Sequence, residues 1–207
     1  MSAPCKIAAF STRLLPMIRR LVALAAFGAV LTGCATTNAN LSHATVAPYR
    51  DTVNLAGTLS VNYEKDGKPE SITGKFDWQQ TPGRVDVSLA SPLGQTLAKI
   101  SVTPESATLT QAGQPPRVAK DLATLTNQSL GWALPVSGLR DWMQGYATGA
   151  DGQRFVASPA NNNVVTNDGW HLRYVSWQDD GAAIPQPKRI DADRAGLAIR
   201  LVIYPAG

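Results

Sequence analysis

Apolar and polar residues alternate along the chain from residue 53 onward. Every second position between residues 53 and 63 is apolar or glycine, and the positions between them are small or polar. A period of two with one apolar side is typical of an antiparallel strand with one buried face. The pattern therefore predicts a strand whose inward face carries Val53, Leu55, Gly57, Leu59, Val61 and Tyr63.

The same alternation recurs in later segments. It predicts further strands at 72–79, 84–89, 95–103, 163–166, 170–177 and 197–204, with a short one around Ala107 and Leu109. Residues 65–68 and 167–169 contain Asp-Gly pairs, which favour hairpin turns. Two prolines mark 179–187 as a loop, and the acidic pairs Asp179-Asp180 and Asp191/Asp193 are expected to be solvated charges in loops or at strand edges. The chain is predicted to be an antiparallel meander.

Two stretches with helical spacing interrupt the strands. Residues 118–128 place Leu122 and Leu125 three positions apart, on one face of a helix. Residues 136–145 space their apolar side chains in the same way, and Gly145 is a typical residue just beyond a helix end. We expect one helix in each stretch.

The first forty residues have a different pattern. A basic segment with Lys6, Arg13, Arg19 and Arg20 precedes an apolar run over 21–31. This order is that of a secretory signal, and the run is far shorter than the ~20 residues of a membrane-spanning helix. Residues 17–33 form a complete signal by themselves, so the pattern leaves open whether translation starts at Met1 or Met17.

The apolar run ends in Leu31-Thr32-Gly33-Cys34, which resembles the bacterial lipobox. The resemblance implies cleavage before Cys34 and a lipid anchor on its thiol. The alternative is an ordinary signal peptide that happens to contain a cysteine. We expect a signal peptide at 1–33, a lipidated polar tether at 34–50 and one folded domain at 51–207. By resemblance to enterobacterial lipoproteins, Ala35 after the cysteine implies sorting to the periplasmic face of the outer membrane.

Removing the signal changes the charge balance. The whole chain has a net charge of +4, but four of its 19 lysines and arginines lie in residues 1–33, which contain no acidic residue. The rest is balanced at 15 basic and 15 acidic residues, so no basic surface for nucleic acid is expected. Cys5 is removed with the signal and Cys34 is acylated, which leaves no thiol for a disulfide or a metal.

The sequence contains no motif of an enzyme. It has no Gly-x-Ser-x-Gly, no phosphate-binding glycine loop and no spaced His/Cys/Asp cluster. His43 lies in the tether, and His171 is predicted on a strand surface beside Arg173. We therefore expect no catalytic residue, no metal and no cofactor, and a periplasmic hydrolase would need a polar constellation that the sequence lacks.

One predicted turn has an unusual residue at its tip. Ser91-Pro92-Leu93-Gly94 has proline and glycine at the second and fourth positions, as in a type I turn. Leu93 then occupies a position where polar residues usually lie. Its side chain either folds back onto the domain or projects into solvent.

Several short motifs resemble the LolB family of outer-membrane lipoproteins. They are Phe76-Asp77-Trp78-Gln79-Gln80, the Ser91–Gly94 turn, Leu130-Gly131-Trp132, Leu134-Pro135-Val136 and Leu139-Arg140-Asp141-Trp142-Met143-Gln144-Gly145. The likeness extends in the same order over most of residues 50–204. It implies a mainly β fold with α insertions, an unclosed antiparallel β-barrel of about eleven strands with helices covering the opening.

The resemblance also implies a function. A family member receives lipoproteins from a periplasmic carrier of the LolA type, holds their acyl chains in a hydrophobic cavity and inserts them into the outer membrane. The family's protruding loop leucine corresponds to Leu93, so the membrane insertion loop is Pro92, Leu93 and Gly94. We expect a monomer whose partners are lipoprotein cargo, the carrier and the membrane.

The inward positions supply candidates for the acyl-chain cavity. On the strands they are Leu55, Leu59, Val61, Phe76, Trp78, Val87 and Leu89, and on the helices Leu122, Leu125 and Trp142. Each of these residues could equally belong to a packed core. The alternative function is that of a structural or scaffolding lipoprotein with a filled core, which binds protein partners only.

Overall fold

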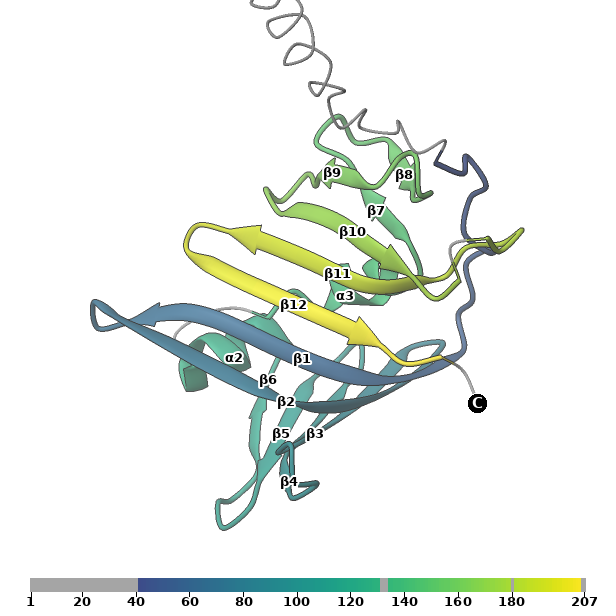
Figure 1. Ribbon diagram of the computed structural model, residues 1–207. Coiled ribbons are helices and arrows are strands. Elements are labelled where there is room, and N and C mark those ends of the chain that lie inside the picture. Colours follow the sequence, from purple (N-terminus) through teal and green to yellow (C-terminus); the bar gives the residue numbers. More distant parts are fainter. Residues whose placement is uncertain (1–40, 131–133, 180, 206–207) are drawn as a thin grey trace, which may run out of the picture. The chain divides into compact units, whose positions relative to one another are not determined.

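The computed structural model describes residues 41–130, 134–179 and 181–205. The predicted signal, Cys34 and the start of the tether lie outside these residues. Ten of the strands form one antiparallel sheet in the order β6-β5-β4-β3-β2-β1-β12-β11-β10-β9, and β7 and β8 form a separate pair (Figure 1). The strands are β1 (Val53–Lys65), β2 (Lys68–Thr81), β3 (Arg84–Ala90), β4 (Thr96–Val102), β5 (Ala107–Gln111), β6 (Arg117–Ala119), β7 (Tyr146–Thr148), β8 (Arg154–Val156), β9 (Asn163–Val165), β10 (His171–Trp177), β11 (Pro187–Arg194) and β12 (Leu197–Ile203).

The sheet is open. Its first half, β1 to β6, is a meander in which each strand pairs with the next, and β9 to β12 form a second meander. The halves join where β1 pairs with β12, with Gly57 opposite Ile203 and Val61 opposite Ile199. The outer strands, β6 and β9, are at opposite ends of the strand order. The predicted unclosed antiparallel barrel with helical insertions is confirmed.

Turn chemistry sets the register of two hairpins, β1–β2 and β11–β12. Asp66 and Gly67 join β1 to β2 with φ angles of 53° and 73°, and Ala195 and Gly196 join β11 to β12 with 47° and 82°. Two successive residues with positive φ define the type I′ turn, whose twist matches that of the flanking strands. These turns keep the apolar side of each strand on one face of the sheet.

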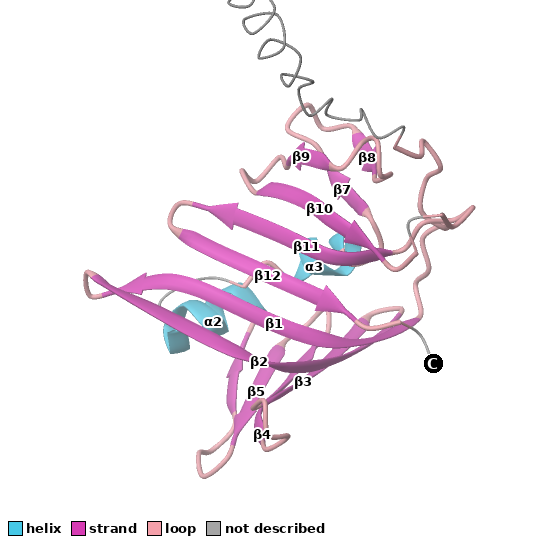
Figure 2. Cartoon of the chain, in the orientation of Figure 1, coloured by secondary structure: helices cyan, strands magenta, loops and turns pink. Residues whose placement is uncertain are grey.

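Two helices lie against that face (Figure 2). They are α2 (Leu122–Leu130) and α3 (Val136–Trp142). Leu122 and Leu125 of α2 are buried, as are Val136, Leu139 and Trp142 of α3. The helices and the inward strand residues form one hydrophobic core.

The first helix begins later than predicted. Val118 was assigned to it, but this residue lies in β6 and its side chain is 67% exposed. The helix begins after Asp121, whose carboxylate accepts a hydrogen bond from the Thr124 amide at 2.7 Å. Asp121 thus acts as an N-cap. The second helix ends at Trp142, and Gly145 follows with a φ of 86°.

The expectation of a solvated charge holds for Asp193, which is exposed, but was wrong for Asp191, which is partly buried. Both lie within β11, and Asp191 pairs across the sheet with Arg173 on β10 and Arg200 on β12. Its carboxylate accepts hydrogen bonds from Arg189 at 2.7 and 3.0 Å and from Arg200 at 3.2 Å. Cross-strand arginines allow an acidic residue in the middle of a sheet.

Part of the expected tether packs on the domain. Val46 is buried, and its amide donates to the Ala157 carbonyl at 3.2 Å. The Tyr146 hydroxyl donates to the Ala47 carbonyl at 2.6 Å, and the Tyr49 ring meets that of Tyr146 edge to face. The folded domain therefore begins before residue 51.

Candidate functional site: an apolar cavity and an exposed loop leucine

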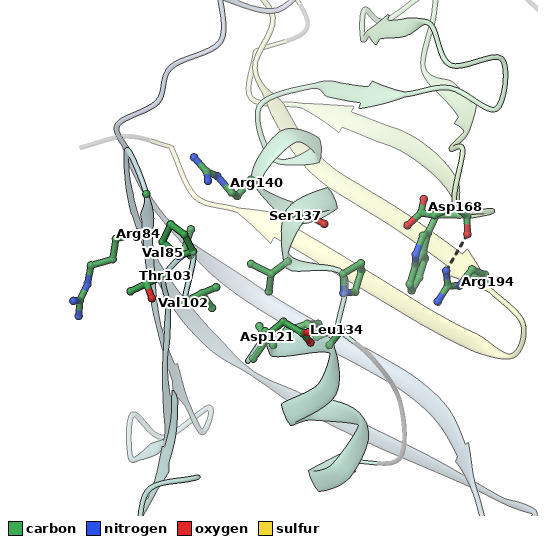
Figure 3. Close-up of a pocket in the computed structure, with 17 residues that line it drawn as sticks. Arg84, Val85, Val102, Thr103, Asp121, Leu134, Ser137, Arg140, Asp168 and Arg194 are labelled. Atoms are coloured by element: carbon green, nitrogen blue, oxygen red, sulfur yellow. Dashed lines mark hydrogen bonds between the residues drawn. The ribbon is translucent and has the colours of Figure 1, made fainter. Parts of the chain in front are cut away.

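A cavity of about 490 Å³ lies between the sheet and the helices (Figure 3). It is bordered by the β2–β3 turn, the loop after β4, the start of α2, the segment leading into α3 and the turn before β10. Its apolar wall consists of Val85, Val102, Leu122, Leu134, Val136 and Trp170. Sites for small ligands have volumes of ~300–1,000 Å³ and mostly apolar walls, so this cavity has the size and chemistry to hold an apolar group.

Local structure explains how these walls meet. Val85 and Val102 are opposite each other on β3 and β4, both on the inward side of the sheet. The amide of Leu134, which precedes α3, donates to the Thr126 hydroxyl of α2 at 2.8 Å. That bond fixes the entry to α3 against α2, and Val136 and Leu122 thereby face one cavity.

Charged residues border the cavity. Arg84 is held by Asp86 through two hydrogen bonds of 2.6 and 2.9 Å. Arg194 donates to the Asp168 carbonyl oxygen at 2.9 Å, and its guanidinium carbon lies 4.9 Å from the Trp170 ring centre. Arg140 also borders the cavity, and its buried Nε has no hydrogen-bond partner in the described part of the chain.

The neighbourhood of α3 disfavours charge. Burial raises the pKa of the half-buried Asp141 carboxyl above its ordinary value, although a hydrogen bond from Tyr49 and the charges of Arg140 and Arg154 act in the opposite direction. Burial also raises the pKa of the Tyr174 hydroxyl well above its ordinary value, with the Asp141 charge adding to the effect. Both shifts indicate an interior of low polarity.

The predicted cavity residues are distributed over the core. Leu122 borders the 490 Å³ cavity. Leu55 and Trp78 border a second hollow of about 590 Å³, where residues 46–56 meet 203–205, and Val87 borders a groove among outward residues of β2 to β5. The other members of the predicted set pack in the hydrophobic core, and they are Leu59, Val61, Phe76, Leu89, Leu125 and Trp142. Their part in holding a ligand stays a prediction.

The β3–β4 turn projects Leu93 into solvent. The side chain is 92% exposed, which excludes a leucine folded back onto the domain. The Gly94 amide donates to the Ser91 carbonyl at 2.9 Å, and the Ser91 amide donates to the Gln95 carbonyl at 2.8 Å. The φ angle of Leu93 is not positive, which fits a type I turn and not a type II turn. Gly94, the last residue of the turn, has a φ of 89°. A closed turn therefore holds the leucine away from the core.

Some site residues were not predicted from the sequence. In the sequence, Arg140 belongs to a family-like motif and Trp170 to a predicted strand. Their spacing gives no sign that they share a cavity with Val85. Trp170 follows a predicted turn, and its immediate environment depends on Arg194 and Trp142, whose ring centre is 5.5 Å from its own. Only the sheet topology brings these residues together.

The described residues include neither a group of three or more potential metal ligands nor a helix long and apolar enough to cross a membrane. His171 is exposed on β10, as expected. The fold and the cavity define an open antiparallel β-sheet protein with a largely apolar recess between its sheet and its helices, a class suited to binding apolar ligands.

Comparison with known proteins identifies the family. The family described as "Outer membrane lipoprotein LolB" matches residues 51–205. The chain belongs to this family. A protein named outer-membrane lipoprotein LolB from Cupriavidus necator is 44% identical over 154 residues, which cover 72% of this chain and 77% of the relative. One of the same name from Thiobacillus denitrificans is 38% identical over 194 residues, covering 89% of this chain and 96% of the relative.

Among solved structures, a LolA superfamily protein from Nitrosomonas europaea is similar with a TM-score of 0.41 and 9% sequence identity. The match covers 76% of this chain and 86% of that protein.

Proposed function

We propose that the protein is a lipid-anchored receptor of the outer membrane that accepts lipoproteins from a LolA-type carrier and inserts them into the membrane. The lipid is carried by Cys34, and the domain faces the periplasm. The 490 Å³ cavity carries this proposal, since its largely apolar wall offers acyl chains a surface that is shielded from part of the surrounding water. Each buried methylene contributes ~0.8 kcal/mol, so transfer needs an apolar site and no catalytic group.

Two further observations support the proposal. The relatives are named outer-membrane lipoproteins, which agrees with the lipobox-like motif that ends at Cys34. The exposed Leu93 presents an apolar side chain on a short turn, where it can enter a lipid interface without unfolding the sheet. The cavity and the loop thus suit successive steps, holding the acyl chains and releasing them.

The alternative is a scaffolding lipoprotein with a filled core. The largely apolar recess between the sheet and the helices disfavours it, because a protein that binds only protein partners has no need of such a recess. A direct test uses a carrier loaded with a lipoprotein. The receptor function requires that cargo move first to the protein and then to liposomes, and a protein that never accepts cargo would be a scaffold.

A cavity-filling variant tests the acyl site itself. Val102 borders the cavity and is half-buried, so Val102→Phe should occupy part of the space that an acyl chain needs. We expect the affinity for a neutral fluorescent acyl probe to fall about tenfold, while the melting temperature stays within a few degrees, because overpacking an open space causes little strain.

Val118→Phe is the matched control. Its side chain is 67% exposed on β6 and does not border the cavity, so probe binding should be unchanged. Equal probe affinity in wild type and Val102→Phe would show that acyl chains bind elsewhere.

A further inference from the structure

Arg140 differs from the other two arginines that border the cavity. Arg84 is engaged by Asp86, and Arg194 by the Asp168 carbonyl and the Trp170 ring. The Nε of Arg140 is buried, and among the residues that the structure describes no acceptor lies within hydrogen-bond distance of it. A buried cationic donor without an acceptor is unfavourable in the empty protein, and an acceptor on a bound ligand removes that penalty.

The position of Arg140 directs it toward the apolar wall. It follows Val136 by four residues, one helical turn along the same side of α3, and both residues border the cavity. Figure 3 shows Arg140 extending from α3 toward the strand that carries Val85, whereas Arg84 points away from the cavity. A ligand along this wall would have its chain beside Val85 and Val136 and its end at the guanidinium.

The acidic residues nearby are already engaged. Asp121 caps α2, and Asp168 accepts from the Thr166 hydroxyl in its own turn. Asp141 follows Arg140 in α3 and lies under the influence of Tyr49 and Arg154 as well. Among the described residues, no ion pair within 4.0 Å involves Arg140. Arg140 therefore interacts with Asp141 only at longer range, and its positive charge can form a close pair with an anion in the cavity.

We propose that this cavity binds phospholipids, with an acyl chain along the apolar wall and the phosphate at Arg140. The inference rests on the proposed acyl-binding function and extends it to a second ligand class. A guanidinium pairs with phosphate through directed, charge-assisted hydrogen bonds. The Trp170 ring borders the same cavity and adds to its apolar wall.

Such binding gives the cavity an occupant between deliveries. Lipids of the surrounding membrane shield the apolar wall from water, and an arriving lipoprotein displaces them. Arg140 thereby distinguishes two ligands that share acyl chains, since the phosphate is present only in the lipid.

The test is a competition on the full lipid-anchored chain in a maltoside detergent. Palmitoyl lysophosphatidic acid and monopalmitoylglycerol, which differ by one phosphate, are added in equal amounts, and native mass spectrometry gives the ratio of the two bound forms. We expect a preference of about tenfold for the phosphate lipid, within the range of a charge-assisted hydrogen bond. In Arg140→Gln the ratio should fall to near one, and Arg140→Lys should keep part of it.

The controls separate this proposal from the acyl-binding function. Arg84→Gln alters an arginine at the same cavity that already has a partner, so the ratio should stay at the wild-type value. The ratio does not depend on how much of a variant folds. No preference in the wild type, or one that survives Arg140→Gln, overturns the phospholipid site while monopalmitoylglycerol binding upholds the acyl site. Failure of both lipids to bind overturns both proposals, and competition by glycerol phosphate alone would indicate a phosphate site without an acyl component.

Discussion

The side chain of Leu93 lies on a turn that does not pack on the core, so its proposed part in membrane insertion can be tested without disturbing the fold. The side chain is 92% exposed, so it buries almost no apolar area on folding. Leu93→Ala should therefore change the free energy of unfolding by less than ~0.5 kcal/mol, whereas a buried leucine would lose ~2–5 kcal/mol. Acceptance of cargo from the carrier should persist, and delivery into liposomes should fail.

The measurement is a two-stage transfer assay with urea unfolding alongside. Leu93→Glu should impair delivery more strongly, because a carboxylate resists entry into the lipid. Leu97→Ala, at a 45% exposed leucine four residues away on β4, is the matched control and should deliver normally. Loss of both stages together with reduced stability would assign Leu93 to the fold and not to insertion.

Gly57, unlike Leu93, lies at a position where any added side-chain atom would clash with the fold. It lies in the middle of β1, and a Cβ built there would be 2.1 Å from the Val202 carbonyl oxygen and 2.8 Å from the Phe76 ring. Because the backbone oxygen cannot move without disturbing the β1–β12 pair, Gly57→Ala should lower the free energy of unfolding by ~1–3 kcal/mol. Urea unfolding measures this. In Gly181→Ala the new Cβ would lie 3.6 Å from an Asp179 carboxylate oxygen in an exposed loop, so this variant should be close to neutral.

At the scale of elements, Asp191 joins β10, β11 and β12. Burial raises the pKa of its carboxyl, but hydrogen bonds and charges from Arg189 and Arg200 outweigh burial, and the folded-state pKa lies below the ordinary value. The folded protein therefore stabilises the ionised form of Asp191 more than the unfolded chain does. This difference adds to the free energy of unfolding at pH values above about 4. That contribution is lost as the pH falls through the folded-state pKa.

Asp191→Asn should accordingly be less stable than wild type at pH 7, on the order of 1–3 kcal/mol. The difference should shrink as the pH falls below about 4, where wild type loses the same charge. Urea unfolding at pH 7, 5 and 3 measures it, and Asp193→Asn on the same strand serves as the control. A difference that is independent of pH would mean that Asp191 acts by packing alone.

The strands that could be predicted share one property. β1, β2, β3, β10 and β12 have one buried face, and burial of alternate residues leaves a period of two in the sequence. β11 was missed because Lys188, Arg189 and Asp191 dominate its composition, and their cross-strand partners are invisible in a single segment. β6, β7 and β8 have three residues each, too few for any period.

Of the candidate site, the sequence predicts the exposed turn but not the cavity. Turn chemistry around Pro92 and Gly94 placed Leu93 at a tip, since local geometry depends on neighbouring residues. The cavity depends on contacts between distant segments, such as Arg140 of α3 and Val85 of β3. Inward-facing residues could be named, but which of them border open space is a property of the assembled core.

At the scale of the whole molecule, the proposed anchor is separable from the fold. Cys34→Ser removes the thiol that carries the lipid, so we expect no acylation and either a soluble protein or an uncleaved precursor. Metabolic labelling with a palmitate analogue, followed by fractionation of membranes, measures this. Cys5→Ser is the control and should remain labelled. Label retained on Cys34→Ser would refute the lipobox assignment.

The pairing of β1 with β12 sets the order of events during synthesis and export. Gly57 meets Ile203, and the Tyr204 amide donates to the Ala56 carbonyl at 2.8 Å, so the central seam joins the beginning of the domain to its end. Contacts between such distant residues form slowly, since a long loop must close first. The domain consequently has no complete sheet until its last strand is available, and the proposed export through a narrow channel would be favoured while this central seam is still unformed.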